Sequence, residues 1–191
     1  MKIIKAVLVG LMVTLPIIAG AQNQPEIKII STPVSWGYRA SKTERVIDTI
    51  IIHTVYNPYY KDKFALNNVL KIMRRYRVAP HFIIQRDGAI NQLVLENNIA
   101  FHAGWDETRR TARLTKTARE DLNLNSIGIE LINSPNEKPT ENQYQSLTRL
   151  ITMLKKRYPI KIVEGHNQAA HGRKTDPWNF DWAYFNTLTA Q

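Results

Sequence analysis

The sequence predicts a single α/β domain in which β-strands and amphipathic helices enclose one core. Two runs of β-branched residues, at 46–53 and 126–132, have strand character, and segments 64–76 and 140–158 carry apolar residues at helical spacing. The chain has 191 residues without a linker-like segment, and its 43% hydrophobic and 22% charged residues match ordinary globular usage. Disordered, collagen-like and coiled-coil chains are therefore disfavoured.

The first strand is predicted at residues 46–53. Its continuous apolar run suits burial on both faces, and it ends at His53, where a side chain can face a cleft. Residues 81–85 and 89–94 are the next strand-like runs. Because an Asp-Gly pair stands between them, we expect an antiparallel hairpin.

Residues 126–132 alternate between the two faces of a strand. The isoleucines at 127 and 129 share one face with Leu131, so Gly128 and Glu130 fall on the other. Gly128 would leave room for a ligand to approach. A short strand is expected at 160–163.

Two amphipathic helices are expected to pack on the sheet. In residues 64–76 large apolar side chains recur at near-helical spacing, with Lys and Arg on the other faces. Thr140 and Gln143 form a capping-box pattern that opens the second helix, and Pro159 ends it.

Two segments are predicted to be loops. Residues 106–125 are rich in Arg, Thr and Lys and lack apolar periodicity, so we expect an exposed basic loop with at most a helical turn. Residues 164–182 are dense in Gly, Pro, His and Trp, which is typical of a shaped loop that carries a site.

The amino terminus has the pattern of an export signal. Two lysines precede an apolar stretch at 6–18 and small residues at 19–21, so we expect cleavage after Ala21. The apolar stretch is shorter than the roughly 20 residues that a spanning helix needs, which disfavours an uncleaved anchor. The mature protein would be exported, periplasmic or secreted, with a polar lead at 22–45.

Charge and cysteine content restrict the partners and cofactors. The 26 Lys and Arg residues against 16 Asp and Glu give a formal charge of +10, which favours a polyanionic surface or partner. The chain has no cysteine, which excludes disulfides, thiolate metal sites and thiol nucleophiles. Any metal must therefore be held by histidine and carboxylate side chains.

Three residues form a candidate metal site. His53 ends the first strand, His166 follows the strand at 160–163, and Asp176 lies beyond a glycine-containing loop that can fold back toward His166. These are the ligand types of a three-ligand zinc site that leaves a fourth position for water. Spacing alone leaves structural histidines open as the alternative, because the tight HExxH spacing is absent.

Glu130 and Lys174 are candidates for acid–base chemistry. Glu130 lies among apolar residues, so burial would raise its pKa and suit it to accept a proton; the alternative is an ion pair with one of the many basic residues. Lys174 lies two residues before Asp176, so both would point the same way in an extended segment. Its ammonium would stabilise an oxyanion, unless it is a solvated surface lysine.

Five segments, in chain order, carry a family resemblance. They are IIIHTVYN (50–57), APHFIIQRDGAINQLV (79–94), AFHAGW (100–105), NSIGIELIN (125–133) and EGHNQAAHGRKTDPWNFDW (164–182). Together they resemble the zinc-dependent N-acetylmuramoyl-L-alanine amidases of the amidase-2 type, relatives of the peptidoglycan recognition proteins. The resemblance covers about residues 46–182, within a catalytic domain expected at 46–191.

The resemblance implies a mixed β-sheet flanked by helices, with zinc (Zn2+, one per chain) in a surface groove. It implies that His53, His166 and Asp176 bind the zinc, that Glu130 is the general base, and that Lys174 polarises the scissile carbonyl or its oxyanion. The implied reaction is hydrolysis of the amide between N-acetylmuramic acid and L-alanine in peptidoglycan or muropeptides.

Five further residues are predicted to contact substrate around this groove. His171 and Trp178 stand at positions where relatives of this family often carry other residues. Arg113 belongs to the basic run that is expected to form a cationic rim. The full set is His102, Trp105, Arg113, His171 and Trp178.

Three other functions stay open at this stage. The first is a non-catalytic peptidoglycan-binding module, and the second is a different zinc amidohydrolase or peptidase. The third, nucleic-acid binding, rests on charge alone, and the export signal and the absence of a nucleic-acid motif count against it. No membrane partner is expected after signal removal, and no oligomeric state is predicted.

Overall fold

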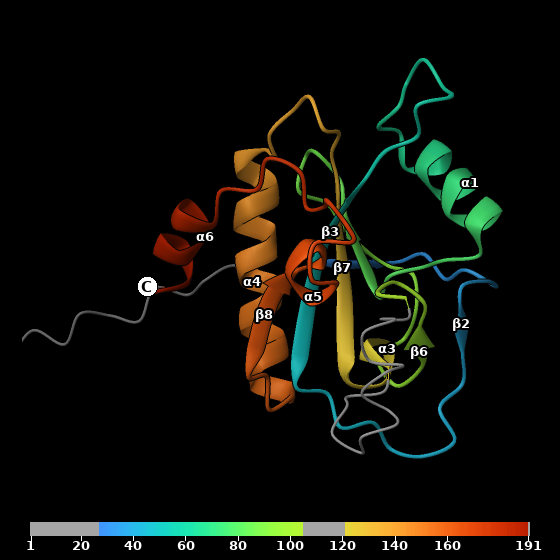
Figure 1. Ribbon diagram of the computed structural model, residues 1–191, viewed down its shortest axis with the longest axis vertical. Helices are drawn as coiled ribbons and strands as arrows, with labels where there is room; N and C mark the ends of the chain where they lie inside the picture. The colour runs from blue at the N-terminus through green and yellow to red at the C-terminus, as the bar shows by residue number, and fades with distance from the viewer. Residues whose placement is uncertain (1–26, 105–120, 191) are drawn as a thin grey trace, which may run out of the picture.

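The architecture is a six-stranded mixed β-sheet with helices on both faces, in a computed structural model that describes residues 27–104 and 121–190 (Figure 1). The strand order is β1-β5-β4-β7-β3-β8, in which β4 and β5 are antiparallel and the other neighbours are parallel. The strands are β1 (Ile29–Ser31), β3 (Thr49–Val55), β4 (Phe82–Ile84), β5 (Ile90–Gln92), β7 (Ser126–Ile132) and β8 (Ile162–Gly165). The mixed sheet implied by the resemblance is confirmed, as is the predicted hairpin.

Smaller elements complete the fold. A two-stranded antiparallel sheet joins β2 (Tyr38–Arg39) to β6 (Ile99–Ala100). The helices are α1 (Leu66–Tyr76), α3 (Leu122–Asn125), α4 (Glu141–Arg157), α5 (His166–Ala169) and α6 (Trp182–Thr189). Among the described residues, no helix combines the length and apolar composition needed to cross a bilayer.

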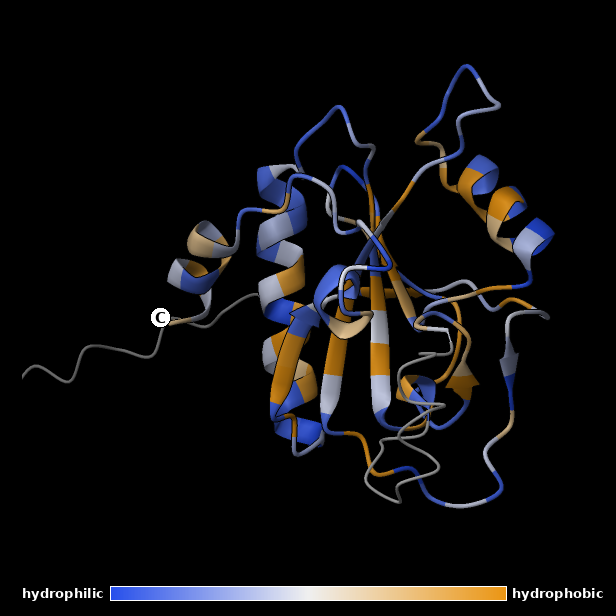
Figure 2. Cartoon of the chain, in the orientation of Figure 1, coloured by the Kyte–Doolittle hydropathy of each residue, from blue (hydrophilic) through white to orange (hydrophobic). Residues whose placement is uncertain are grey.

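Helices α4 and α1 pack on opposite faces of the sheet (Figure 1). The isoleucines of β3 and β7 that face α4 are fully buried against its leucines. On the other face, Ile83 and Ile132 pack with Val69 and Met73 of α1. The central strands are accordingly mostly hydrophobic, whereas α4 is mixed (Figure 2). This burial of both sheet faces explains why β3 has a continuous apolar run.

The start of α4 is fixed as predicted. Thr140 accepts a hydrogen bond from the backbone N–H of Gln143, whose side chain accepts one from the backbone N–H of Thr140. The amide of Gln143 also donates to the carbonyls of Ile84 and Ile132, at 3.1 Å each. The cap therefore ties α4 to the ends of β4 and β7.

Two strand boundaries differ from the prediction. Strand β3 begins at Thr49, since Val46 is 74% exposed, and continues to Val55, so His53 lies inside the strand rather than at its end. Strand β8 begins two residues later than predicted and ends at Gly165, because pairing with β3 continues past the apolar run.

Some predicted loop residues belong to regular structure. The predicted basic loop ends in α3, whose Leu122 and Asn123 are buried rather than exposed. The polar lead at 22–45 contributes β1, which pairs with β5 at the edge of the sheet, and β2. The predicted signal at 1–21 and most of the basic run, at 105–120, lie outside the described residues.

Candidate metal centre

Strand register brings three site residues to one level of the sheet. His53 of β3 stands opposite Glu130 of β7, and Ile52 stands opposite Gly165, the last residue of β8. His166, the residue after Gly165 and the first of α5, therefore follows on at the level of His53. Adjacent parallel strands place these side chains at neighbouring positions.

The loop after α5 returns Asp176 to the two histidines. The backbone N–H of Asn167 donates to the carbonyl of Asp176 at 2.7 Å, which closes the loop. One carboxylate oxygen of Asp176 lies 3.2 Å from Nδ1 of His53, and the other lies 3.1 Å from Nδ1 of His166. One ligand atom from each of these three residues falls within 4.8 Å of the others. The predicted fold-back thus occurs.

The electrostatic state of these residues suits a cation. His53 and His166 are buried, and the side chain of Asp176 is 14% exposed. Burial lowers the pKa of His53 to about 4, which favours the neutral imidazole that binds metals. Burial opposes ionisation of Asp176, but its contacts with His166 and His53 outweigh this and hold the pKa of its carboxyl below the ordinary value.

The contacts of His166 bear on whether the three side chains suit a metal ion. Its Nε2 lies 3.3 Å from the carbonyl oxygen of Ala103, which can only accept a hydrogen bond, so Nε2 carries the proton. Nδ1 of the same ring faces the carboxylate of Asp176, 3.1 Å away. Two histidine nitrogens and one carboxylate are the donors that zinc and similar divalent ions take in catalytic sites. The residues therefore fit a metal ion.

Glu130 lies beside this ligand set with an unsatisfied oxygen. Its Oε2 is buried and has no hydrogen-bond partner among the described residues. Burial and the charge of Asp176 raise the pKa of Glu130 well above its ordinary value. The ion pair considered as the alternative for Glu130 is therefore not the arrangement seen at Oε2. A carboxyl group in this state suits proton transfer.

The remaining predicted site residues occupy different positions. Lys174 is exposed, yet near enough that its charge is among the causes, after burial, of the lowered pKa of His53. His171 is also exposed, in the left-handed backbone region at φ 50°. Trp178 is half-buried and contacts Tyr56 edge-to-face, with ring centroids 5.8 Å apart. Trp105 and Arg113 lie outside the described residues.

His102 lies against the candidate metal ligand His53. Its Nδ1 is 3.0 Å from Nε2 of His53, and its Nε2 is 3.3 Å from Oγ of Ser126. Both ring nitrogens therefore face protein atoms. The ring packs on Gly128, so the space that the glycine was expected to leave for a ligand is filled by this imidazole.

A methyl group at Gly128 has no room beside this ring. A Cβ atom there would lie 2.4 to 2.7 Å from three ring atoms of His102. We expect Gly128→Ala to reduce the free energy of unfolding by about 1–3 kcal/mol, as overpacking does, when unfolding in urea is followed by circular dichroism. The double variant with His102→Ala serves as the control and should lose less than the sum of the single variants. Strictly additive losses would show that the two residues do not collide.

Arg45 organises the backbone next to this site, and sequence reasoning missed it. Its five N–H groups donate to five backbone carbonyls at 2.5 to 3.2 Å. Burial lowers the pKa of Arg45 to about 10, so the guanidinium stays charged at neutral pH. No motif or spacing in the sequence distinguishes Arg45 from the other arginines. The carbonyls belong to Glu96, Asn98, Asn123, Leu124 and Ser126.

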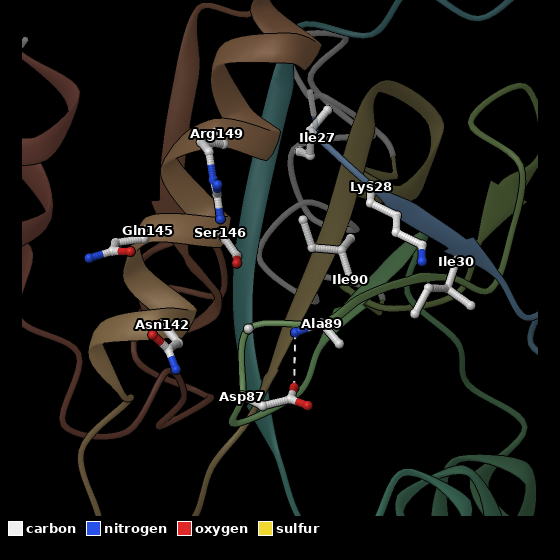
Figure 3. Close-up of a pocket in the computed structure, with 11 residues that line it drawn as sticks. Ile27, Lys28, Ile30, Asp87, Ala89, Ile90, Asn142, Gln145, Ser146 and Arg149 are labelled. Carbon is white, nitrogen blue, oxygen red and sulfur yellow. Dashed lines mark hydrogen bonds between the residues drawn. The ribbon is translucent and has the colours of Figure 1, made fainter. Parts of the chain in front are cut away.

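A separate cavity of about 420 Å³ lies away from the metal ligands (Figure 3). It is lined by β1, the β4–β5 turn and α4, and it includes the side chains of Lys28, Asp87 and Arg149. The view shows Asp87 accepting a hydrogen bond from the backbone of Ala89. Because none of the metal ligands lines it, this cavity is not part of the candidate site.

Comparison with known proteins identifies similar chains. A family model described as N-acetylmuramoyl-L-alanine amidase matches residues 43–179. The 1,6-anhydro-N-acetylmuramyl-L-alanine amidase AmpD of Citrobacter freundii is 40% identical over 115 residues, which are 59% of this chain and 57% of that protein. AmpD of Escherichia coli K12 is 39% identical over 118 residues, 60% of each chain. The chain thus matches less than two thirds of the length of these relatives.

Two solved structures have the same fold. A crystal structure of AmpD superposes with a TM-score of 0.67 at 30% identity, covering 84% of this chain and 93% of the other. The amidase AmiD of E. coli, in complex with the substrate anhydro-N-acetylmuramic acid-L-Ala-D-γ-Glu-L-Lys, superposes with a TM-score of 0.58 at 26% identity. It covers 78% of this chain and 60% of the other.

Proposed function

We propose a function from one premise: the chain belongs to the N-acetylmuramoyl-L-alanine amidase family. It hydrolyses the amide bond between the lactyl group of N-acetylmuramic acid and L-alanine in peptidoglycan or muropeptides. The observation that carries the proposal is the meeting of His53, His166 and Asp176 beside Glu130, whose buried Oε2 has no hydrogen-bond partner among the described residues. A protein that only bound the cell wall would need neither this ligand set nor a buried base.

The proposed metal is zinc, held by Nδ1 of His53, Nδ1 of His166 and the carboxylate of Asp176. When bound, zinc supplies a Lewis acid that lowers the pKa of a water ligand to about 7, and a positive charge that favours the ionised form of Glu130. Ligand softness agrees with this choice, because a His₂Asp set suits zinc better than it suits calcium or magnesium.

The protein's own residues handle the proton and the developing charge. Glu130 takes a proton from the attacking water and passes it to the nitrogen of L-alanine, which leaves as a free amine. Lys174 is exposed at the rim of the site, where its ammonium stabilises the oxygen of the scissile carbonyl as it becomes negative.

The names of the relatives support a substrate class within this reaction. The curated relatives are named for 1,6-anhydro-N-acetylmuramyl-L-alanine, and AmiD was solved with an anhydro-muramyl peptide. We include soluble anhydro-muropeptides among the proposed substrates. Trp178 lies two residues after Asp176, and Tyr56 lies three residues after His53. The two rings contact each other and offer an aromatic surface for a sugar ring.

Export is a separate part of the proposal. The first 21 residues carry the charge and apolar pattern of a signal peptide, and peptidoglycan lies outside the cytoplasmic membrane. Intact-mass measurement of the protein from a periplasmic extract should give a chain that begins at Gln22. A chain of full mass in the cytosolic fraction would contradict export and leave the reaction untouched.

The direct test is digestion of purified sacculi and of defined anhydro-muropeptides, followed by mass spectrometry. We expect free stem peptides that begin with L-alanine. Treatment with a chelator should stop their release, and stoichiometric zinc should restore it. Release of disaccharides would identify a glycosidase, and unchanged release after verified metal removal would contradict the metal-dependent mechanism.

A further inference from the structure

We infer that His102 and Ser126 are positioning residues that set which nitrogen of His53 faces the metal site. The inference rests on the proposed metal centre, and it concerns residues that family membership does not assign. It replaces the predicted substrate contact of His102 with a role behind the ligand.

A chain of hydrogen bonds that starts at a backbone carbonyl determines which ring nitrogen of His102 carries the proton. The carbonyl of Leu122 can only accept, and the hydroxyl of Ser126 donates to it. The hydroxyl has no second proton, so its oxygen must accept from Nε2 of His102, 3.3 Å away. A neutral imidazole carries one proton, and His102 therefore has it on Nε2 and a lone pair on Nδ1.

His102 in turn determines which nitrogen of His53 carries a proton. Nδ1 of His102 lies 3.0 Å from Nε2 of His53, so Nε2 of His53 must carry the proton and donate it. Its Nδ1 is then unprotonated and lies 3.2 Å from the carboxylate of Asp176.

One backbone segment serves both histidine ligands. The side chain of His102 meets His53, while the carbonyl of Ala103 meets Nε2 of His166. Asn123 of α3 fixes this segment, because its side-chain oxygen accepts from the N–H groups of residues 102 and 103, at 3.1 and 2.9 Å. The two imidazoles thus present Nδ1 to the same point.

The test measures zinc affinity by competition with a chromophoric chelator, on the purified full chain. His102→Ala should bind zinc about 10- to 100-fold more weakly, the usual cost of removing an outer-shell partner. His102→Asn should restore most of the affinity, since its side-chain oxygen can occupy the position of Nδ1. His102→Gln should not, since its acceptor reaches the position of Nε2 and faces Ser126.

The matched pair of amides separates positioning from packing. Equal affinities of the Asn and Gln variants, or an Ala variant that binds as tightly as the wild type, would overturn the inference. Circular dichroism and urea unfolding without metal identify any variant that fails to fold.

A second measurement needs no substitution and no zinc. Long-range ¹H–¹⁵N correlation spectra of the metal-free protein should show the Nε2–H form for both His53 and His102, and an Nδ1–H form at His102 would overturn the inference. Failure of the wild type to bind zinc would instead contradict the proposed function, so the two failures are distinguishable.

Discussion

Glu130→Gln is expected to reduce hydrolysis on the order of 10²- to 10⁴-fold while the protein keeps its metal and its fold. Gln matches Glu in size but cannot accept a proton. Within the described part of the chain, the buried Oε2 of Glu130 has no hydrogen-bond partner to lose, so the substitution removes little that stabilises the fold. The measurement is kcat on a defined muropeptide, together with zinc content by elemental analysis.

Two companion variants define this result. Asp176→Ala removes a metal ligand and should lose both zinc and activity, whereas Glu130→Gln should lose activity alone. Glu141→Gln changes an exposed carboxylate on α4, on the opposite face of the sheet from the site, and should behave as the wild type. A Glu130→Gln enzyme with wild-type kcat would show that another group is the base.

Among the substitutions proposed for this protein, Arg45→Ala is expected to produce the largest loss of stability, on the order of 3–5 kcal/mol in the free energy of unfolding. The substitution leaves buried carbonyl oxygens without donors, and each unsatisfied group costs about 1–3 kcal/mol, reduced where water enters. Arg45→Lys should recover only part of the loss, because an ammonium has three donors and no planar fork. Unfolding in urea provides the measurement.

Arg157→Ala is the matched control for charge removal. Arg157 is 52% exposed and pairs with Glu96 at 3.1 Å, and such surface pairs contribute about 1 kcal/mol or less. If the Arg45 and Arg157 variants lost equal stability, the carbonyl contacts of Arg45 would have no special weight. We also expect Arg45→Ala to weaken zinc binding, because the carbonyls of Asn123 and Ser126 accept hydrogen bonds from Arg45.

The sequence predicted an element best where the spacing of its apolar residues matches the face that the structure buries. Strand β7 was predicted to the residue, because Ile127, Ile129 and Leu131 recur at every second position on one buried face between Ser126 and Ile132. Strand β8 was shifted, because its last residues, Glu164 and Gly165, are held by pairing with β3 and not by their own apolar character. Helix α5 was missed because four polar and small residues carry no helical period.

The site was predictable in its residue types and not in its supporting contacts. His53, His166 and Asp176 were singled out by position and by resemblance, and the structure brings them together. The contact between His53 and His102 depends on the path of the segment after β6, which no spacing encodes. Arg45 is one of 26 basic residues, and its role depends on carbonyls up to 81 positions away.

The distance in sequence between the ligands has a consequence for when the ion is acquired. His53 and Asp176 are 123 positions apart, and their meeting requires the final loop to dock on a strand from the first third of the protein. During synthesis, a nascent polypeptide lacks the complete chelating set until Asp176 has left the ribosome. Under the proposed export, a chain that crossed a membrane unfolded would travel without an ion, and the metal pool at its destination would select the ion that it takes up.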